Sequence, residues 1–302
     1  MSKEIFEKLK CDKNFDKNYL LINNADYPDT KKAHNFSKKL YELFYSLSLD
    51  DDHFISQIKM QWQQRFWEMY LACSLDNLNF KLSSKNEGPD LLIEKNHIND
   101  LTIWVEAVCS SKGNGSFSVK ELSFHEDGNI EINATDEAIV LRLLSSLKDK
   151  NEKLTRYRLK NLISDKDPCI IAINAYELHQ ISLIRPNSPY ILKALFPIGD
   201  MQYNFSTENI FYDYNPFIKK GEAEISTRVF STNEYKYISA IIYSEVSAYD
   251  YEYKLGYDYM IIHNPFAKNP IKSGLLKIGK EFTVIFSDSG KAKFQIIDWN
   301  CL

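Results

Sequence analysis

The run Cys169-Ile170-Ile171-Ala172-Ile173 constrains the fold more than any other segment of the sequence. It is continuously apolar, and it lies between the turn residues Asp167-Pro168 and Asn174. Such a run is typical of a strand buried on both faces, because a half-exposed strand alternates apolar with polar residues. A strand of this kind needs helices on both sides of its sheet. The sequence therefore predicts an α/β protein with a three-layer core.

Amphipathic segments supply the helices around this strand. Residues 30–47 carry apolar side chains at helical spacing. The acids at 50–52 offer capping positions for a second helix, which we expect to run unbroken from there to about Cys73. A third and longer helix is predicted over 135–163. Strands are expected between and after these helices, at 80–82, 90–94, 101–108, 225–230, 237–244, 257–263, 282–287 and 293–298, with an additional hairpin near 117–132.

The length of 302 residues suits one large domain or two modest ones. We expect an N-terminal helical arm over 1–50, an α/β core over 51–180 and a β-rich C-terminal extension over 181–302. The last boundary follows a change in composition, since prolines and tyrosines become frequent beyond about residue 180.

Charge and cysteine usage exclude several classes of protein. Lys and Arg number 37 against 41 Asp and Glu, so the net charge is −4, which argues against a protein that coats nucleic acid by bulk charge but leaves a local basic groove open. The five cysteines never form a CxxC pair, which disfavours a disulfide framework and a zinc ribbon. Neither an apolar signal segment nor a membrane span is visible, and we expect a soluble, cytoplasmic protein.

Three acidic residues stand in contexts that suggest chemistry. Asp90 opens a predicted strand directly after Gly88-Pro89, and Glu68 lies on the predicted second helix. Glu106 sits inside the apolar segment Ile103–Val108, where an unpaired carboxylate is expensive to bury. A divalent cation shared by Asp90, Glu106 and the carbonyl of Ala107 or Val108 would offset this expense, because hard cations such as Mg²⁺ take oxygen ligands.

With these residues the sequence resembles the PD-(D/E)xK, or restriction-endonuclease-like, nuclease superfamily. Pro89-Asp90 matches the PD and Glu106 matches the second acid, while Glu68 matches the helical acid that precedes the motif in many members. The segments 138–159 and 169–173 resemble the crossover helix and following strand of that core. The resemblance covers about residues 54–175, with tight matches at 66–70, 88–93 and 103–113.

The resemblance implies a restriction-endonuclease-like three-layer core and a nuclease that hydrolyses phosphodiester bonds, expected in DNA, with Mg²⁺ or Mn²⁺. It implies that Asp90 and Glu106 hold the metal and that Glu68 orders a second metal or a water. The lysine of the motif is missing, because Val108 occupies its position. Lys112 and Lys150 are the substitutes we consider, and either could stabilise charge at the attacking water or the phosphate. The alternative is a catalytically degenerate member that serves as a binding or interaction scaffold.

Basic residues of the predicted long helix could contact phosphates of a nucleic acid: Lys148, Lys153, Arg156 and Arg158. A solvated helix face with ordinary ion pairs explains them equally well. Tyrosines alternate with polar residues over 249–259, which indicates a half-exposed ribbon or a contact with a partner protein or a second copy of the chain. His263 precedes Asn264-Pro265, a common turn start, and we interpret it as structural.

Overall fold

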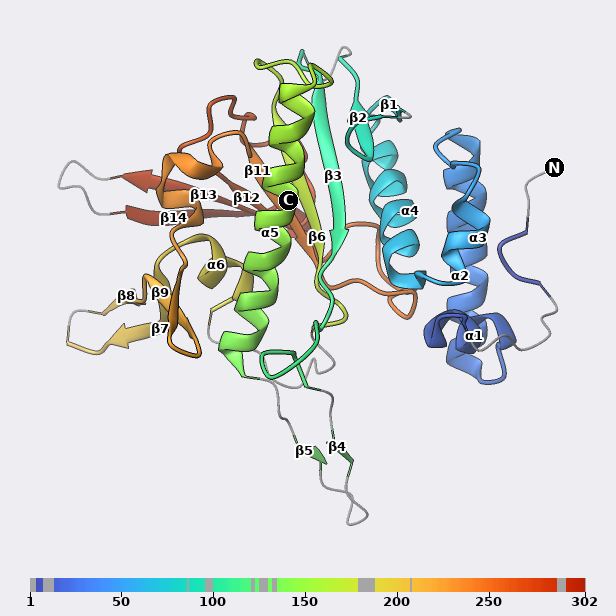
Figure 1. Ribbon diagram of the computed structural model, residues 1–302, viewed down its shortest axis with the longest axis horizontal. Coiled ribbons are helices and arrows are strands. Elements are labelled where there is room, and N and C mark those ends of the chain that lie inside the picture. The colour runs from blue at the N-terminus through green and yellow to red at the C-terminus, as the bar shows by residue number, and fades with distance from the viewer. Residues whose placement is uncertain are drawn as a thin grey trace.

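The structure, a computed structural model, describes residues 4–7, 14–85, 87–95, 100–120, 123–124, 130–131, 135–178, 188–206, 208–286 and 292–301. These residues form a mixed α/β fold, in which one large sheet is flanked by helices on both faces (Figure 1). The predicted α/β class, with helices on both sides of a central sheet, is confirmed.

The central sheet has eight strands in the order β1-β2-β3-β6-β11-β12-β13-β14. Strands β3, β6 and β11 run parallel to one another, whereas β1, β2 and β3 are joined antiparallel. Strands that follow residue 240 thus complete the sheet that the N-terminal half begins. The bounds are β1 (Leu82–Ser83), β2 (Leu91–Ile93), β3 (Ile103–Cys109), β6 (Cys169–Asn174), β11 (Ala240–Ser244), β12 (Met260–His263), β13 (Lys280–Phe286) and β14 (Ala292–Asp298).

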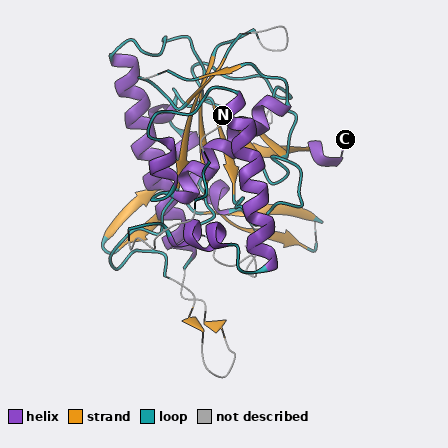
Figure 2. Cartoon of the chain, turned by 90° about the vertical axis from the view of Figure 1, so that its right-hand side faces the viewer, coloured by secondary structure: helices purple, strands orange, loops and turns teal. Residues whose placement is uncertain are grey.

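Helices cover the two faces of this sheet unequally. On one side lie α1 (Lys17–Asn24), α2 (Pro28–Ser46), α3 (Phe54–Ile58) and α4 (Trp62–Asn77), which are in front when the molecule is turned as in Figure 2. On the other side lie α5 (Asp136–Leu159) and α6 (Tyr190–Leu195). Thr135 caps the N-terminus of helix α5, because its hydroxyl accepts from the Ala138 amide. The helix lies in the connection from β3 to the parallel strand β6.

The predicted second helix is wrong in one respect, because it is broken between α3 and α4. Gln61 has φ −138° and ψ 57°, which is not helical. The carbonyl of Lys59 accepts a hydrogen bond from the Asp16 amide at 2.8 Å, which ties the break to the start of α1. A contact across more than 40 residues of sequence thus accompanies the end of α3, and the local sequence pattern contains no sign of it.

Two hydrophobic clusters, one on each face, show how β3 is oriented. Ile103, Val105 and Ala107 belong to the cluster on the α4 side. Trp104 belongs to the cluster on the α5 side, and Glu106 shares its face because side chains alternate along a strand. The strand β6 is buried along its whole length, as its apolar run predicts.

Three smaller hairpins stand beside the sheet. Strands β4 (Ser123–Phe124) and β5 (Ile130–Glu131) pair within the predicted hairpin near 117–132, most of whose other residues lie outside the described ranges. The other two hairpins are β7–β8 (Ile198–Asn204 and Asn209–Tyr214) and β9–β10 (Phe217–Lys220 and Ala223–Ser226). Of these four strands, only part of β10 was predicted, by the strand expected at 225–230. Short 3-10 turns at Val229–Ser231, Asn233–Tyr235 and Trp299–Cys301 complete the described elements.

The tyrosine-rich segment 249–259 is not a ribbon. It forms turns between β11 and β12, and Tyr259 is buried against Trp67. The Tyr257 hydroxyl donates to Asp250, and the Tyr251 hydroxyl donates to Asp29. The expected ribbon is therefore wrong, because no residue of 249–259 lies in a strand. Among the helices of the described part, none combines the length and the apolar character that a membrane crossing requires.

Candidate functional site

Glu106 is the centre of the candidate site. It lies in the middle of β3 and is 0% exposed. One carboxylate oxygen, Oε1, accepts from the ammonium of Lys150 at 2.6 Å and from that of Lys153 at 2.5 Å. The other oxygen, Oε2, is buried and has no hydrogen-bond partner among the described residues. A buried polar atom without a partner is uncommon in folded proteins, and a bound water or ion is one explanation for it.

The two lysines come from the same helix. Lys150 and Lys153 are three residues apart on α5, so their side chains leave neighbouring points of one helix flank. Burial alone lowers the pKa of Lys153, but the carboxylate of Glu106 more than reverses this and holds that pKa above its ordinary value. Lys153 therefore carries its full positive charge at neutral pH.

Asp90 lies beside Glu106 at the start of β2. Its side-chain Oδ2 accepts a 2.6 Å hydrogen bond from the Ala107 main-chain amide, just beyond Leu91 and Val105, the last paired residues of β2 and β3. Gly88, two residues before Asp90, has φ +136°, a backbone conformation that favours glycine. Because the N–H and C=O of a strand residue point to the same side, the Ala107 carbonyl is also directed toward Asp90. Val108 faces β6 instead, as do Trp104 and Ser110, whose amides donate to β6-side carbonyls.

The electrostatic environment links the three acids. Burial raises the pKa of Glu106, the charge of Asp90 raises it further, and the two lysines partly offset both effects. Burial likewise raises the pKa of Glu68, against the opposing charge of Arg65 and with a further contribution from Asp90. Asp90 thus stands close enough to both glutamates to disfavour their negative charge, which is the condition that a bound cation relieves.

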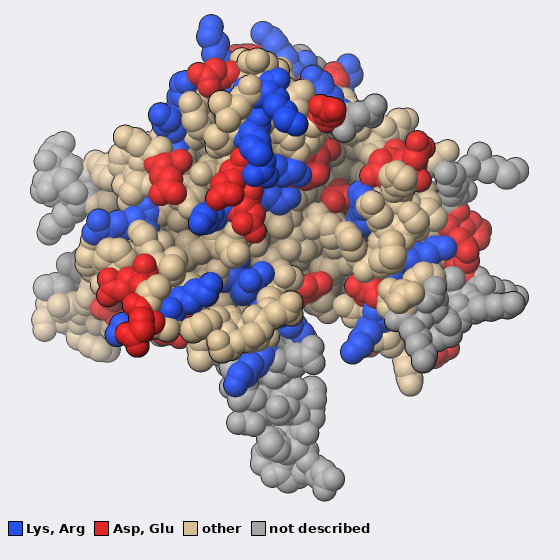
Figure 3. All heavy atoms as spheres, in the orientation of Figure 1, with Lys and Arg blue, Asp and Glu red and all other residues tan. Residues whose placement is uncertain are grey.

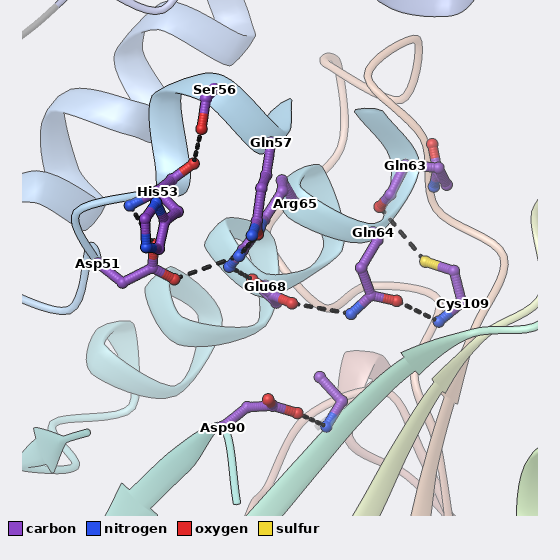
Figure 4. A network of polar contacts seen from close by, with 11 residues as sticks. Asp51, His53, Ser56, Gln57, Gln63, Gln64, Arg65, Glu68, Asp90 and Cys109 are labelled. Atoms are coloured by element: carbon purple, nitrogen blue, oxygen red, sulfur yellow. Dashed lines mark hydrogen bonds and ion pairs between the residues drawn. The ribbon is translucent and has the colours of Figure 1, made fainter. Parts of the chain in front are cut away.

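Glu68 is held by its own helix α4. Its Oε2 accepts from Arg65 at 2.6 Å and its Oε1 accepts from the side-chain Nε2 of Gln64 at 2.8 Å. Gln64 in turn accepts from the Cys109 amide at 2.8 Å, which joins α4 to the end of β3. Arg65 also contacts Gln57 and, at 3.2 Å, Asp51 (Figure 4). Both oxygens of Glu68 are therefore in use, and the N-terminal helical layer fixes its orientation through Arg65.

These residues fit a cation at Glu106 and Asp90 better than one at Glu68. In the described part of the chain no three His, Cys, Asp or Glu side chains stand close enough to one another to enclose a metal ion. Two carboxylates are nevertheless available, together with a directed main-chain carbonyl, and a hard cation such as Mg²⁺ commonly completes so small a protein ligand set with water. The partnerless Oε2 of Glu106 is the atom that supports this fit.

The remaining predicted residues lie in different places. Lys112 is not one of the lysines on Glu106, and its charge acts on Glu177, where it partly offsets the rise in pKa caused by burial. Arg158 donates to the carbonyls of Ser164 and Asp167 and stacks on Tyr237 at 4.8 Å, so its guanidinium is held by contacts within the protein. Lys148 and Arg156 are exposed on α5. Figure 3 shows basic side chains gathered over the upper half of this helix, with acidic ones beside them.

Sequence reasoning found the acids and Lys150 but not the whole set of neighbours. Lys153 was predicted to contact nucleic acid rather than Glu106, although its spacing of three from Lys150 was a usable signal. Gln64, Arg65 and Tyr157 were not predicted as site residues, because polar residues on an amphipathic helix are ordinarily solvated. Comparisons with protein-family models, with curated proteins and with solved structures give no match to this chain.

Proposed function

We propose that this protein is a divalent-metal-dependent nuclease that hydrolyses phosphodiester bonds in DNA, with a restriction-endonuclease-like core. The proposal is supported by an acid at the start of β2, an acid in the middle of the antiparallel neighbour β3, and a crossover through α5 to the parallel strand β6. It is supported further by the helical acid Glu68 on α4, which packs on the same sheet.

The observation that carries the proposal is the difference in bonding between the two oxygens of the Glu106 carboxylate. One oxygen is bound by two ammonium groups, and the other is buried without a partner beside Asp90. A carboxylate that served stability alone would be expected to have both oxygens bonded, since each unsatisfied buried oxygen destabilises the fold by about 1–3 kcal/mol.

Each residue then has a role that follows from its position. Asp90, Glu106 and the Ala107 carbonyl would hold the cation. A cation in this place supplies Lewis-acid activation of water and neutralises charge on the scissile phosphate. Lys150 replaces the lysine that the motif has in the position of Val108, and its ammonium, 2.6 Å from Glu106, stabilises negative charge that develops at the phosphate. Glu68, held by Arg65 and Gln64, orders water at the edge of the site.

The decisive experiment is a cleavage assay on the full-length chain with Mg²⁺ or Mn²⁺, using plasmid DNA, single-stranded DNA and RNA as substrates. Asp90→Asn and Glu106→Gln should abolish cleavage and the calorimetric binding of Mn²⁺, while Lys150→Ala should lower kcat by about 10²- to 10³-fold and retain Mn²⁺ binding. Glu152→Gln, which removes an exposed acid from the same helix, is the control and should leave both properties unchanged.

A catalytically degenerate scaffold is the second candidate. It is favoured by Glu68, whose two oxygens are both occupied by protein donors. Under this alternative the wild-type protein binds no Mn²⁺ and cuts none of the three substrates. Cleavage that survives unchanged in Asp90→Asn and Glu106→Gln would remove these residues from the active site.

A further inference from the structure

The two lysines on Glu106 are not equivalent. The side chain of Lys150 is 17% exposed and that of Lys153 is 34% exposed. Both ammonium groups nevertheless end on the same oxygen, Oε1, while Oε2 stays without a partner. One ammonium is enough to bind one carboxylate oxygen, and two like charges on a single atom repel each other. The more exposed of the two is therefore the one available to a ligand that approaches from solvent.

Lys153 has a second neighbour that Lys150 lacks. Its ammonium lies over the ring of Tyr157, 5.6 Å from the ring centroid. Tyr157 is four residues further along α5 and half-buried, so it follows Lys153 on the same flank of the helix. The charges of Glu106 and Asp90 both act on Tyr157, which places its ring beside the acids as well.

This pair has the chemistry of an anion site. An ammonium offers three hydrogen-bond donors and a phenol offers one, and at neutral pH neither side chain carries a negative charge. The non-bridging oxygens of a phosphodiester accept only, so a phosphate can take donors from both groups at once. The carboxylates of Glu106 and Asp90 lie on the buried side of Lys153 and Tyr157. An anion can therefore approach these two side chains only from the solvent side.

We infer that Lys153 and Tyr157 bind a backbone phosphate of the nucleic acid next to the scissile one, while Lys150 remains at the reaction centre. The inference rests on the proposed nuclease function and adds a substrate subsite to it. When the substrate binds, the ammonium of Lys153 leaves Oε1 of Glu106 and binds the phosphate, while the ammonium of Lys150 stays bound to Oε1. Lys153 and Tyr157 then govern substrate affinity, and Lys150 governs turnover.

The test separates binding from cleavage. Binding of a fluorescein-labelled DNA duplex is measured by anisotropy in Ca²⁺, in place of Mg²⁺, over a range of salt concentrations. Lys153→Ala should weaken binding about tenfold and reduce the slope of log K against log salt by about one. Lys153→Arg should preserve most of the affinity, because the cation is retained, and Tyr157→Phe should weaken binding about threefold. Lys38→Ala, which removes an exposed lysine from α2, is the matched control.

The kinetic arm uses the same variants with Mg²⁺ or Mn²⁺. Lys153→Ala should raise KM with little change in kcat, whereas Lys150→Ala should lower kcat. If Lys153→Ala binds the duplex with wild-type affinity and an unchanged salt slope, or if it loses kcat at unchanged affinity, the subsite is wrong. A wild-type protein that binds DNA through Lys153 but never cleaves it would overturn the nuclease proposal and leave the subsite standing. A protein that neither binds nor cleaves would overturn both.

Discussion

Two glutamates buried in the same sheet have opposite surroundings. Glu106 on β3 is 0% exposed and Glu281 on β13 is 2% exposed. Glu281 accepts from His263 at 2.6 Å, from the Gly274 amide at 3.0 Å on each oxygen, and from the Trp299 indole at 2.9 Å. Both of its oxygens are bonded, whereas Glu106 has one crowded oxygen and one without a partner.

The pKa values of the two residues reflect this difference. Burial raises the pKa of Glu281, but its donors, His263 first, outweigh burial and lower that pKa to about 2. For Glu106, burial and Asp90 outweigh the two lysines, and its pKa is raised. The fold around Glu281 therefore favours the charged carboxylate, whereas the fold around Glu106 disfavours it. The carboxylate of Glu281 joins the loop at Gly274 and the turn at Trp299 to the sheet. The Oε2 atom of Glu106 has no such role, and a ligand that binds it is part of the proposed function.

A substitution at Val105 tests most severely whether a buried carboxylate is tolerated only where hydrogen-bond donors surround it. Val105 is the neighbour of Glu106 on β3, is 0% exposed and faces the apolar cluster under α4. A carboxylate placed there meets no donor, so Val105→Asp should lower the free energy of unfolding by more than about 4 kcal/mol. Chemical denaturation followed by circular dichroism measures this. A loss no larger than that of Glu106→Gln would contradict the orientation of the strand.

Replacing each glutamate by glutamine sharpens the comparison directly. Glu281→Gln keeps the shape but removes the charge that His263 and two other donors bind, so it should destabilise the protein by about 3 kcal/mol. Glu106→Gln should change the free energy of unfolding by less than about 1 kcal/mol in the absence of metal, because burial and Asp90 disfavour the charge that the lysines favour. Denaturation of the two variants side by side measures both values. Equal losses would mean that the two carboxylates are alike.

The sequence predicted the elements whose signals are local and missed those that depend on distant contacts. The apolar run of β6 and the long helical pattern of α5 are local signals, and both elements were predicted to within a few residues. At the break between α3 and α4 the Lys59 carbonyl accepts from the distant Asp16 amide, and no local pattern predicts this contact. The hairpin β7–β8 was missed because its exposed face lacks the alternation that a half-buried strand shows.

The candidate site divides in the same way. Asp90 and Glu106 were found because their local contexts are unusual, one after Gly88-Pro89 and one inside an apolar strand. Which lysine contacts Glu106 depends on how α5 crosses the sheet, so the sequence alone does not distinguish between Lys112 and Lys150. In the structure both Lys150 and Lys153 contact Glu106, and the contact of Lys153 spans 47 residues of sequence.

The pH dependence of stability tests the comparison most finely. The pKa of Glu281 falls from an ordinary 4.5 to about 2 on folding, so its ionisation stabilises the fold above pH 4.5 and this contribution is lost as the pH falls toward 2. At pH 4 the loss should still be under about 1 kcal/mol, rising to about 3 kcal/mol at pH 2.

Other carboxylates act in the opposite direction and must be subtracted. Burial raises the pKa of Asp258 to about 6, so its protonation adds stability as the pH falls from 6 toward its ordinary 3.8. The difference in free energy of unfolding between wild type and Glu281→Gln removes such shared contributions. This difference should shrink steadily below pH 4.5, while the difference between wild type and Glu106→Gln should not shrink in that way, because a raised pKa gives no stabilising charge to lose. A flat difference for Glu281 between pH 6 and 3 would show that its donors do not favour the ionised form, and the contrast with Glu106 would then rest on geometry alone.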